Sequence, residues 1–163
     1  MADSDQALAL FNDFSAREKD ADKVVICAHA ITTNVSFLIG VALNAINDSA
    51  AQIKKDKPAK RAIGQARKSV NDLLKQAKSL TDIQDDDQRR VMSREEVKSA
   101  LKILADYHEG AKIVTSRLPV VGRIMNAAFR DATVISPGPS ALEDLPLRLV
   151  TKYVLQNTSP GTT

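Results

Sequence analysis

The stretch that sets the fold class lies between Lys23 and Asp48 and reads VVICAHAITTNVSFLIGVALNAIN, residues 24–47. It carries no charged side chain and is long enough for a helix that spans a bilayer, which needs about 20 residues. Its uncharged polar residues are not scattered, because they recur at helical spacings of three and four: His29, Thr33, Ser36, Gly40, Asn44 and Asn47. The stretch therefore predicts one long apolar helix with a narrow, weakly polar stripe.

Three interpretations of this helix remain open at the level of sequence. A membrane span would place His29, Asn34 and Asn44 at a substantial insertion cost, so it is the least favoured. A central helix buried on nearly all sides of a bundle explains the apolar content most simply. If the stripe instead faces outward, its lack of charge predicts a contact with another subunit. The assembly surface would then consist of Thr33, Ser36, Gly40 and Asn44.

Helical periodicity continues on both sides of this stretch. A first helix is expected over residues 4–14, followed by a second that extends to about residue 47. A third begins near Asp56-Lys-Pro58, a capping acid and a proline that the first turn tolerates. Its buried seam is Ile63, Ala66, Val70, Leu73, Ala77 and Leu80. Further helices are expected over residues 93–118, with Val97, Leu101, Leu104, His108, Ala111 and Val114 on one face, over 120–135, and within 140–156.

Two segments match the capping-box pattern, in which a Ser or Thr at the helix N-cap is followed three residues later by Glu. Ser15 with Glu18 predicts the start of the second helix, and Ser93 with Glu96 predicts the start of the fourth. The acidic stretch at residues 82–87 is interpreted as a connector, because adjacent like charges are unfavourable at a helix C-terminus. Isolated glycines within helical patterns, Gly64 and Gly122, usually mark close helix packing.

The predicted fold class is an all-α, up-and-down bundle of four main helices, with room for a short extra helix at each terminus. The chain of 163 residues fits one domain, expected over residues 1–156. A break is expected at Ser136-Pro-Gly-Pro139, and a disordered tail over residues 157–163.

The sequence contains no arrangement of His, Cys or acidic residues that is typical of an active site. Neither His29 nor His108 has metal-ligand spacing, and both are expected to be hydrogen-bonded core residues. Glu95 and Glu96 lie in a polar stretch and are expected to be solvated. Cys27 lies in an apolar run and is expected to be a buried thiol without a nucleophilic role. No catalytic residue, metal, cofactor or small-molecule substrate is therefore implied.

Charge is balanced overall, with 23 Lys and Arg against 20 Asp and Glu, but it is segregated locally. Between Lys54 and Lys78 nine basic residues face only Asp56 and Asp72. Such a helix face can meet nucleic-acid phosphates or anionic lipid headgroups, although a solvated surface is the commoner explanation. The candidate anion-binding residues are Lys60, Arg61, Arg67, Lys68 and Lys75.

These patterns predict a non-enzymatic structural or interaction protein that associates with itself or with another helical protein. The alternatives are an anion-binding module that contacts nucleic-acid backbone or an acidic membrane, and, less favoured, a membrane-active bundle. The N-terminal segment has neither the basic nor the apolar region of a signal peptide, so a cytoplasmic location is expected.

Overall fold

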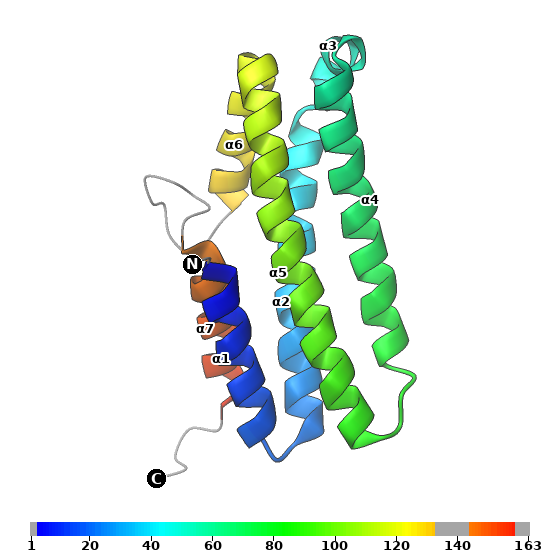
Figure 1. The fold of residues 1–163 in the computed structure, drawn as a ribbon, viewed down its shortest axis with the longest axis vertical. Helices are drawn as coiled ribbons and strands as arrows, with labels where there is room; N and C mark the ends of the chain where they lie inside the picture. Colours follow the sequence, from blue (N-terminus) through cyan, green and yellow to red (C-terminus); the bar gives the residue numbers. More distant parts are fainter. Residues whose placement is uncertain (1–2, 133–143, 159–163) are drawn as a thin grey trace.

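The computed structural model describes residues 3–132 and 144–158, and within these ranges it contains helices and no strand. The all-α class predicted from the sequence is therefore confirmed. The helices are α1 (Asp3–Arg17), α2 (Ala21–Ala45), the short 3-10 helix η1 (Asn47–Ser49), α3 (Ala50–Lys55), α4 (Lys57–Leu80), α5 (Asp86–Arg117), α6 (Pro119–Ala132) and α7 (Leu145–Asn157) (Figure 1).

Three long helices, α2, α4 and α5, run the length of the molecule and pack against one another (Figure 1). The fourth side is not one long helix. It is divided between α6, which covers α2 and α5 at one end, and the pair α1 and α7, which covers them at the other. An up-and-down bundle of four main helices is thus not confirmed, since three short helices share the fourth position.

The helix α2 occupies the centre of this arrangement, in contact with α4, α5, α6 and α7. Its inward residues are almost completely buried and include Val24, Ile31, Val35 and Ile39. They meet the seams of the neighbouring helices, where Leu73 of α4 and Leu101 and Leu104 of α5 are each at most 2% exposed. One continuous core therefore runs through the bundle.

The two predicted capping boxes are wrong, because both serines lie inside helices. Ser15 belongs to the last turn of α1, and α2 starts later, after Asp20, whose side chain accepts from the Asp22 amide. Ser93 lies inside α5, which begins at Asp86 with Asp85 as its N-cap. The last residues of the acidic stretch therefore form the first turn of α5, and negative charge is favourable at a helix N-terminus. In each case an aspartate caps the helix in place of the serine: Asp20, five residues after Ser15, and Asp85, eight residues before Ser93.

The predicted start at Asp56 is confirmed, because its carboxylate accepts from the Ala59 amide and Pro58 lies in the first turn of α4. Pro146 likewise lies in the first turn of α7. Gly122 allows a close approach of α6 to α5, since a Cβ there would lie 2.5 Å from the Cα of Thr115. Gly64 does not, because a Cβ there would meet nothing within 4 Å. The predicted break at residues 136–139 and residues 159–163 of the predicted tail lie outside the described residues.

Candidate functional site

The most unusual surface of the molecule is the exposed side of α2. Two large apolar side chains on it are more than half exposed, Ile26 at 56% and Phe37 at 58%. No charged residue lies among them, because none occurs between Lys23 and Asp48. We call this surface the outward face of α2 and define it as Ile26, Ala30, Thr33, Phe37, Gly40 and Asn44. A helix face open to solvent ordinarily carries Lys or Glu, so an exposed face without charge is uncommon.

The predicted assembly residues lie on two sides of the helix. Thr33 and Asn44 are exposed, and Gly40 is half-buried. Ser36 is only 6% exposed and points into the bundle, so it does not belong to the outward face. Sequence reasoning followed the polar residues and so missed the two large apolar ones, Ile26 and Phe37. Ile26 and Phe37 are eleven residues apart, Ile26 is seven residues before Thr33, and Phe37 is seven before Asn44. These spacings place all four residues on the same side of a helix.

Gly40 is the only glycine of α2 and leaves the outward face locally flat. A Cβ added to Gly40 would meet nothing within 4 Å, so no neighbouring helix of the same chain requires the glycine. A glycine inside a helix costs about 0.5–1 kcal/mol relative to alanine. Packing within the described residues of this chain therefore does not explain Gly40.

A hydrogen bond between half-buried His29 and buried Glu96 links α2 to α5. His29 Nδ1 donates to Glu96 Oε1 over 2.9 Å, and Glu96 is 1% exposed. This hydrogen bond raises the pKa of His29, while burial opposes the shift and attraction to the Glu96 charge adds to it. The prediction that His29 is hydrogen-bonded is confirmed, but His29 is half-buried and not a core residue, and the prediction that Glu96 is solvated is wrong. Glu96 follows Ser93 and precedes Ala100 at helical spacing, which puts it on the inward side of α5 beside Val97.

A groove of about 680 Å³ lies between α4 and α5. Its floor reaches Ile39 of α2 and Tyr107 of α5, which are fully or almost fully buried. Its walls carry small residues, including Ala62, Ala66 and Gly110. Sequence analysis predicted His108 for the inward side of α5 at this level, but Tyr107 is the buried residue and His108 is half-buried.

Tyr107, one of the residues that line this groove, is a buried aromatic side chain. Tyr107 is 3% exposed, and its hydroxyl, like seven other buried side-chain polar atoms, has no hydrogen-bond partner among the described residues. Its ring stacks on Phe129 of α6, with 5.5 Å between the ring centroids. Burial raises the pKa of Tyr107 well above its usual value, so the phenol remains protonated and can donate.

The candidate anion-binding residues differ in exposure to solvent. Lys60, Arg61, Lys68 and Lys75 are exposed on α4, whereas Arg67 is half-buried. Arg67 donates to the Leu43 carbonyl over 2.9 Å and to Asn47 Oδ1 over 3.2 Å. It therefore holds α4 against the end of α2 and is not available as a free surface cation.

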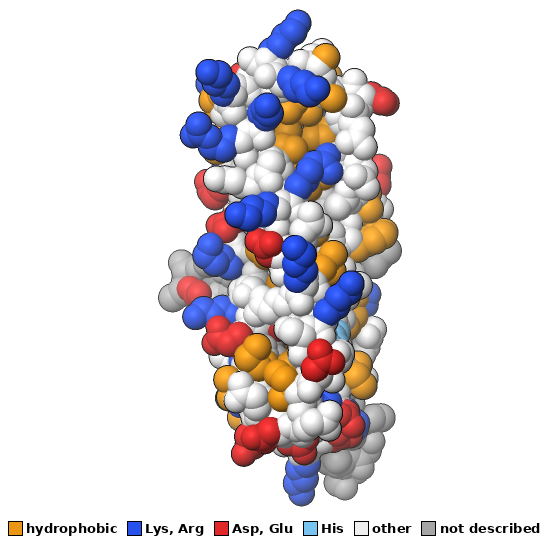
Figure 2. All heavy atoms as spheres, turned by 90° about the vertical axis from the view of Figure 1, so that its right-hand side faces the viewer, with side chains coloured by type: hydrophobic (Ala, Val, Ile, Leu, Met, Phe, Trp, Pro, Cys, Tyr) orange, Lys and Arg blue, Asp and Glu red, His pale blue; other side chains and the backbone are white. Residues whose placement is uncertain are grey.

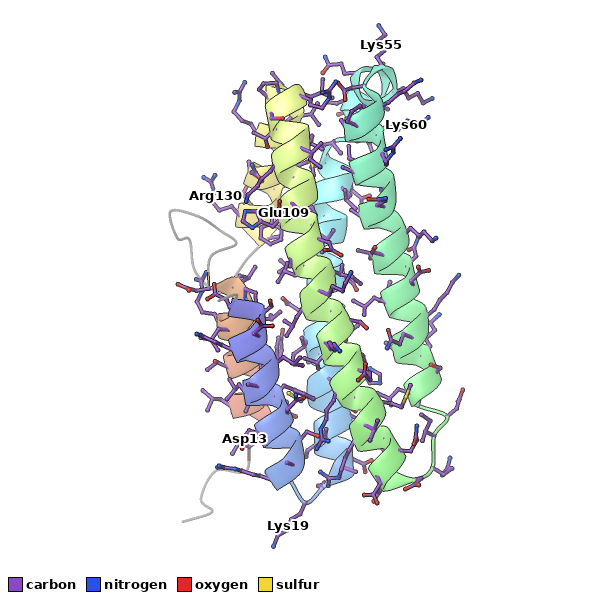
Figure 3. All side chains as sticks on the ribbon, in the orientation of Figure 1. Asp13, Lys19, Lys55, Lys60, Glu109 and Arg130 are labelled. Atoms are coloured by element: carbon purple, nitrogen blue, oxygen red, sulfur yellow. The ribbon has the colours of Figure 1, made fainter. Side chains whose placement is uncertain are left out.

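Basic side chains gather at the end of the molecule where α3 meets α4 (Figure 2). Figure 3 shows Lys55 and Lys60 extending outward there, with Asp13 and Lys19 near the opposite end. Arg117 of α5 reaches the same corner and donates to Asp56 over 2.7 Å. That hydrogen bond is the main cause that lowers the pKa of Asp56. Asp56, one of the two acids in this basic segment, is thus already paired.

In the part of the chain that the structure describes, neither a metal-binding site nor a reactive thiol is supported. It contains no group of three or more His, Cys, Asp or Glu side chains that could hold a metal ion. Cys27 is fully buried, and burial raises the pKa of its thiol to about 12. The thiol is therefore protonated at neutral pH and is a packing residue.

Comparison with known proteins gives no further guidance, since no protein-family model, no curated protein and no solved structure matches this chain. Among the described residues, α2 is one helix that is long and apolar enough to cross a membrane by length and composition. More than half of its most apolar window is buried within the bundle, as in the core helix of a soluble protein.

Proposed function

We propose that this chain is a non-enzymatic structural or interaction protein that self-associates through the outward face of α2. The observation that supports this proposal is the joint exposure of Ile26 and Phe37 on a face that carries no charge. Large apolar side chains surrounded by small and uncharged ones are typical of the centre of a protein interface. The single buried thiol of Cys27 fits an intracellular, cytoplasmic setting, which is part of the proposal.

A second copy of this chain suits the surface, because the outward face of α2 is complementary to itself in an antiparallel arrangement. In an antiparallel pairing of two α2 helices with a two-fold axis near residue 35, Phe37 lies opposite Thr33 and Gly40 lies opposite Ala30. The large side chain of Phe37, and the backbone that Gly40 leaves uncovered, then each face a small residue of the other copy. A two-fold contact uses the same patch on both subunits, which is the commonest arrangement of homo-oligomers. At about 1.5 Å per residue, α2 is about 37 Å long, enough for an extended contact.

The test places one acid on each of two helical glycines that both have room for a side chain, half-buried Gly40 and exposed Gly64. Neither Gly40 nor Gly64 has an atom within 4 Å of its added Cβ, so both tolerate a side chain in the single chain. We expect Gly40→Glu to yield a smaller particle with an unchanged helical circular dichroism spectrum, because the acid would be buried in the contact. Gly64→Glu, on α4, should leave the particle size unchanged.

Equal effects of the two glycine variants on particle size would reject the outward face of α2 as the contact. Thr33→Glu and Asn44→Asp provide further exposed positions on the same face. Ser36→Glu is not diagnostic, because Ser36 is buried and its substitution should unfold the chain whether or not it associates.

A second candidate function is anion binding along the exposed basic side of α4. The observation in its favour is that Lys60, Arg61, Lys68 and Lys75 are exposed, while Asp56 is paired with Arg117. Such a surface would bind phosphate backbones or acidic lipid through charge alone, so its affinity should fall steeply with salt. Retention of RNA or anionic vesicles at low salt, and its loss in a Lys60→Gln/Lys75→Gln variant, would support this candidate. A membrane-active bundle would instead release vesicle contents.

A further inference from the structure

We propose that one end of the bundle, formed by α3, the start of α4 and the junction of α5 with α6, docks on an anionic lipid bilayer. We call this surface the basic end and define it by six exposed basic residues: Lys54, Lys55, Lys57, Lys60, Arg61 and Arg117. The inference rests on the second candidate function, anion binding. It narrows that function from the whole side of α4 to one end of the molecule, and from any phosphate to a lipid surface.

An ion pair joins the separate segments of the basic end into one surface. Arg117, the last residue of α5, donates to both carboxylate oxygens of Asp56, over 2.7 and 3.0 Å. Asp56 is the N-cap of α4, so the start of α4 and the end of α5 meet at this point. Figure 2 shows the basic side chains gathered at this end of the molecule, with apolar surface between them.

The charge of the basic end is not neutralised within the described part of the chain. Two acids accompany it, exposed Asp48 and Asp56, and Asp56 is already paired with Arg117. The remaining five cations form no ion pair with a described residue. Helix stability does not explain Lys57 and Lys60 either, because they lie in the first turn of α4, where the helix dipole disfavours cations. The basic end is therefore complementary to an anionic surface.

Apolar side chains among these cations favour a bilayer over nucleic acid. Val120, at the start of α6, is 57% exposed, and Pro58 and Pro119 are exposed as well. Basic and apolar side chains occur together on protein surfaces that enter the headgroup region of anionic membranes. Residues 47–61 and 112–123, which form this end, contain no aromatic side chain on which a base could stack.

The rest of α4 is less suited to the same partner. Acidic residues resume there, since Asp72 lies one turn from Lys68. Lys68 and Lys75 follow Lys57 by about 16 and 27 Å along the helix. Both distances exceed the Debye length of about 8 Å at physiological salt. If the basic end meets the membrane, these two lysines contribute little, and they provide a matched control.

Co-sedimentation with vesicles tests the docking. The full chain is mixed with vesicles of equimolar phosphatidylserine and phosphatidylcholine, or of phosphatidylcholine alone. We expect binding to the anionic vesicles only, and weaker binding as salt is raised. Lys54→Gln/Lys57→Gln should weaken it about thirtyfold, since each cation near an anionic leaflet accounts for about fivefold. Lys68→Gln/Lys75→Gln removes the same charge and should weaken it less than about twofold. Circular dichroism checks that both variants are folded.

Single tryptophans report which surface meets the lipid. The chain contains no tryptophan, so each substitution introduces a unique fluorophore. Three exposed apolar positions are compared: Val120 at the basic end, Leu155 of α7 at the other end of the bundle (Figure 1), and Phe37 on the outward face of α2. We expect anionic vesicles to shift the emission of Val120→Trp to shorter wavelength. The emission of Leu155→Trp and Phe37→Trp should not change when vesicles are added.

Four results would overturn the proposal. One is the absence of binding to anionic vesicles at low salt, or equal binding to neutral ones. Another is equal loss in the two lysine variants, which would assign anion binding to the side of α4 and leave the second candidate function standing. A third is an emission shift in Leu155→Trp or Phe37→Trp without one in Val120→Trp. The fourth is duplex RNA that binds as tightly as the anionic vesicles, which would assign the basic end to nucleic acid.

Discussion

At the scale of single residues, the pair formed by His29 and Glu96 is the feature with the clearest solution consequence. Glu96 is buried at the contact of α2 and α5, and its only hydrogen-bond partner among the described residues is His29. Because the hydrogen bond raises the pKa of His29 above its unfolded value of about 6.5, protonation favours the folded state. The stabilising contribution is fully present below about pH 6.5 and is lost as the pH rises through the folded pKa.

We therefore expect the free energy of unfolding to fall as the pH is raised from about 6 to 8, the range in which histidine titrates. Urea unfolding at a series of pH values measures this dependence. His29→Gln should reduce the slope, whereas His108→Gln, the other histidine, should leave it nearly unchanged. A wild-type midpoint that rises over this range would mean that the pair acts in the opposite sense.

The same pair shows where sequence reasoning reaches its limit. The hydrogen-bonded state of His29 was predicted from its place in an apolar helix, but its partner was not. Glu96 lies in the polar run Ser93-Arg-Glu-Glu96, and composition alone cannot distinguish a buried acid from its exposed neighbour Glu95. The distinction depends on which side of α5 faces α2, and that register is set by packing between helices distant in sequence.

At the scale of helices, two glycines differ in whether a close helix contact requires them. Gly122 stands where α6 turns back onto α5, and its missing Cβ is required by the backbone of Thr115. We expect Gly122→Ala to destabilise the chain by about 1–3 kcal/mol, the usual cost of overpacking. Gly64→Ala, on the open side of α4, should instead stabilise it by about 0.5–1 kcal/mol. Thermal unfolding of both variants measures the difference, and shifts of the same sign would contradict the assigned contacts.

The helix seams supply a second prediction at this scale. Leu73 and Leu104 are each 1% exposed and belong to the core that joins α4 and α5 to α2. Truncation of either to alanine should cost about 2–5 kcal/mol, the range for emptying a buried aliphatic site. Lys68→Ala, on the solvent side of α4, should change stability by less than about 0.5 kcal/mol. Chemical denaturation is the appropriate measurement, and equal effects would mean that the register of α4 is misassigned.

Most helices could be predicted from periodicity, whereas their starts and their assembly could not. The seam from Ile63 to Leu80 has helical spacing throughout, so α4 follows from local pattern and a cap at Asp56. The starts of α2 and α5 were misplaced because Asp20 and Asp85 compete with Ser15 and Ser93 as caps over a few residues. The shared fourth side of the bundle depends on how α1, α6 and α7 dock, and no local signal carries that information.

At the scale of the whole molecule, the chain places its two unusual surfaces on different helices. The outward face of α2 is apolar and carries no charge, while α4 carries the exposed cations and one wall of the groove. Self-association through α2, as proposed, would leave the groove between α4 and α5 uncovered. Association should also be insensitive to salt, because no charge takes part in the contact.

The mass of the particle in solution tests the central proposal most directly. Light scattering coupled to size exclusion, at low and high salt, compares the wild-type chain with Phe37→Glu, which places a charge at the most exposed large side chain of α2. We expect the wild type to have at least twice the chain mass of 17.7 kDa at both salt concentrations, and Phe37→Glu to be a folded particle of 17.7 kDa. A folded wild-type particle of 17.7 kDa at high micromolar concentration would contradict self-association through α2.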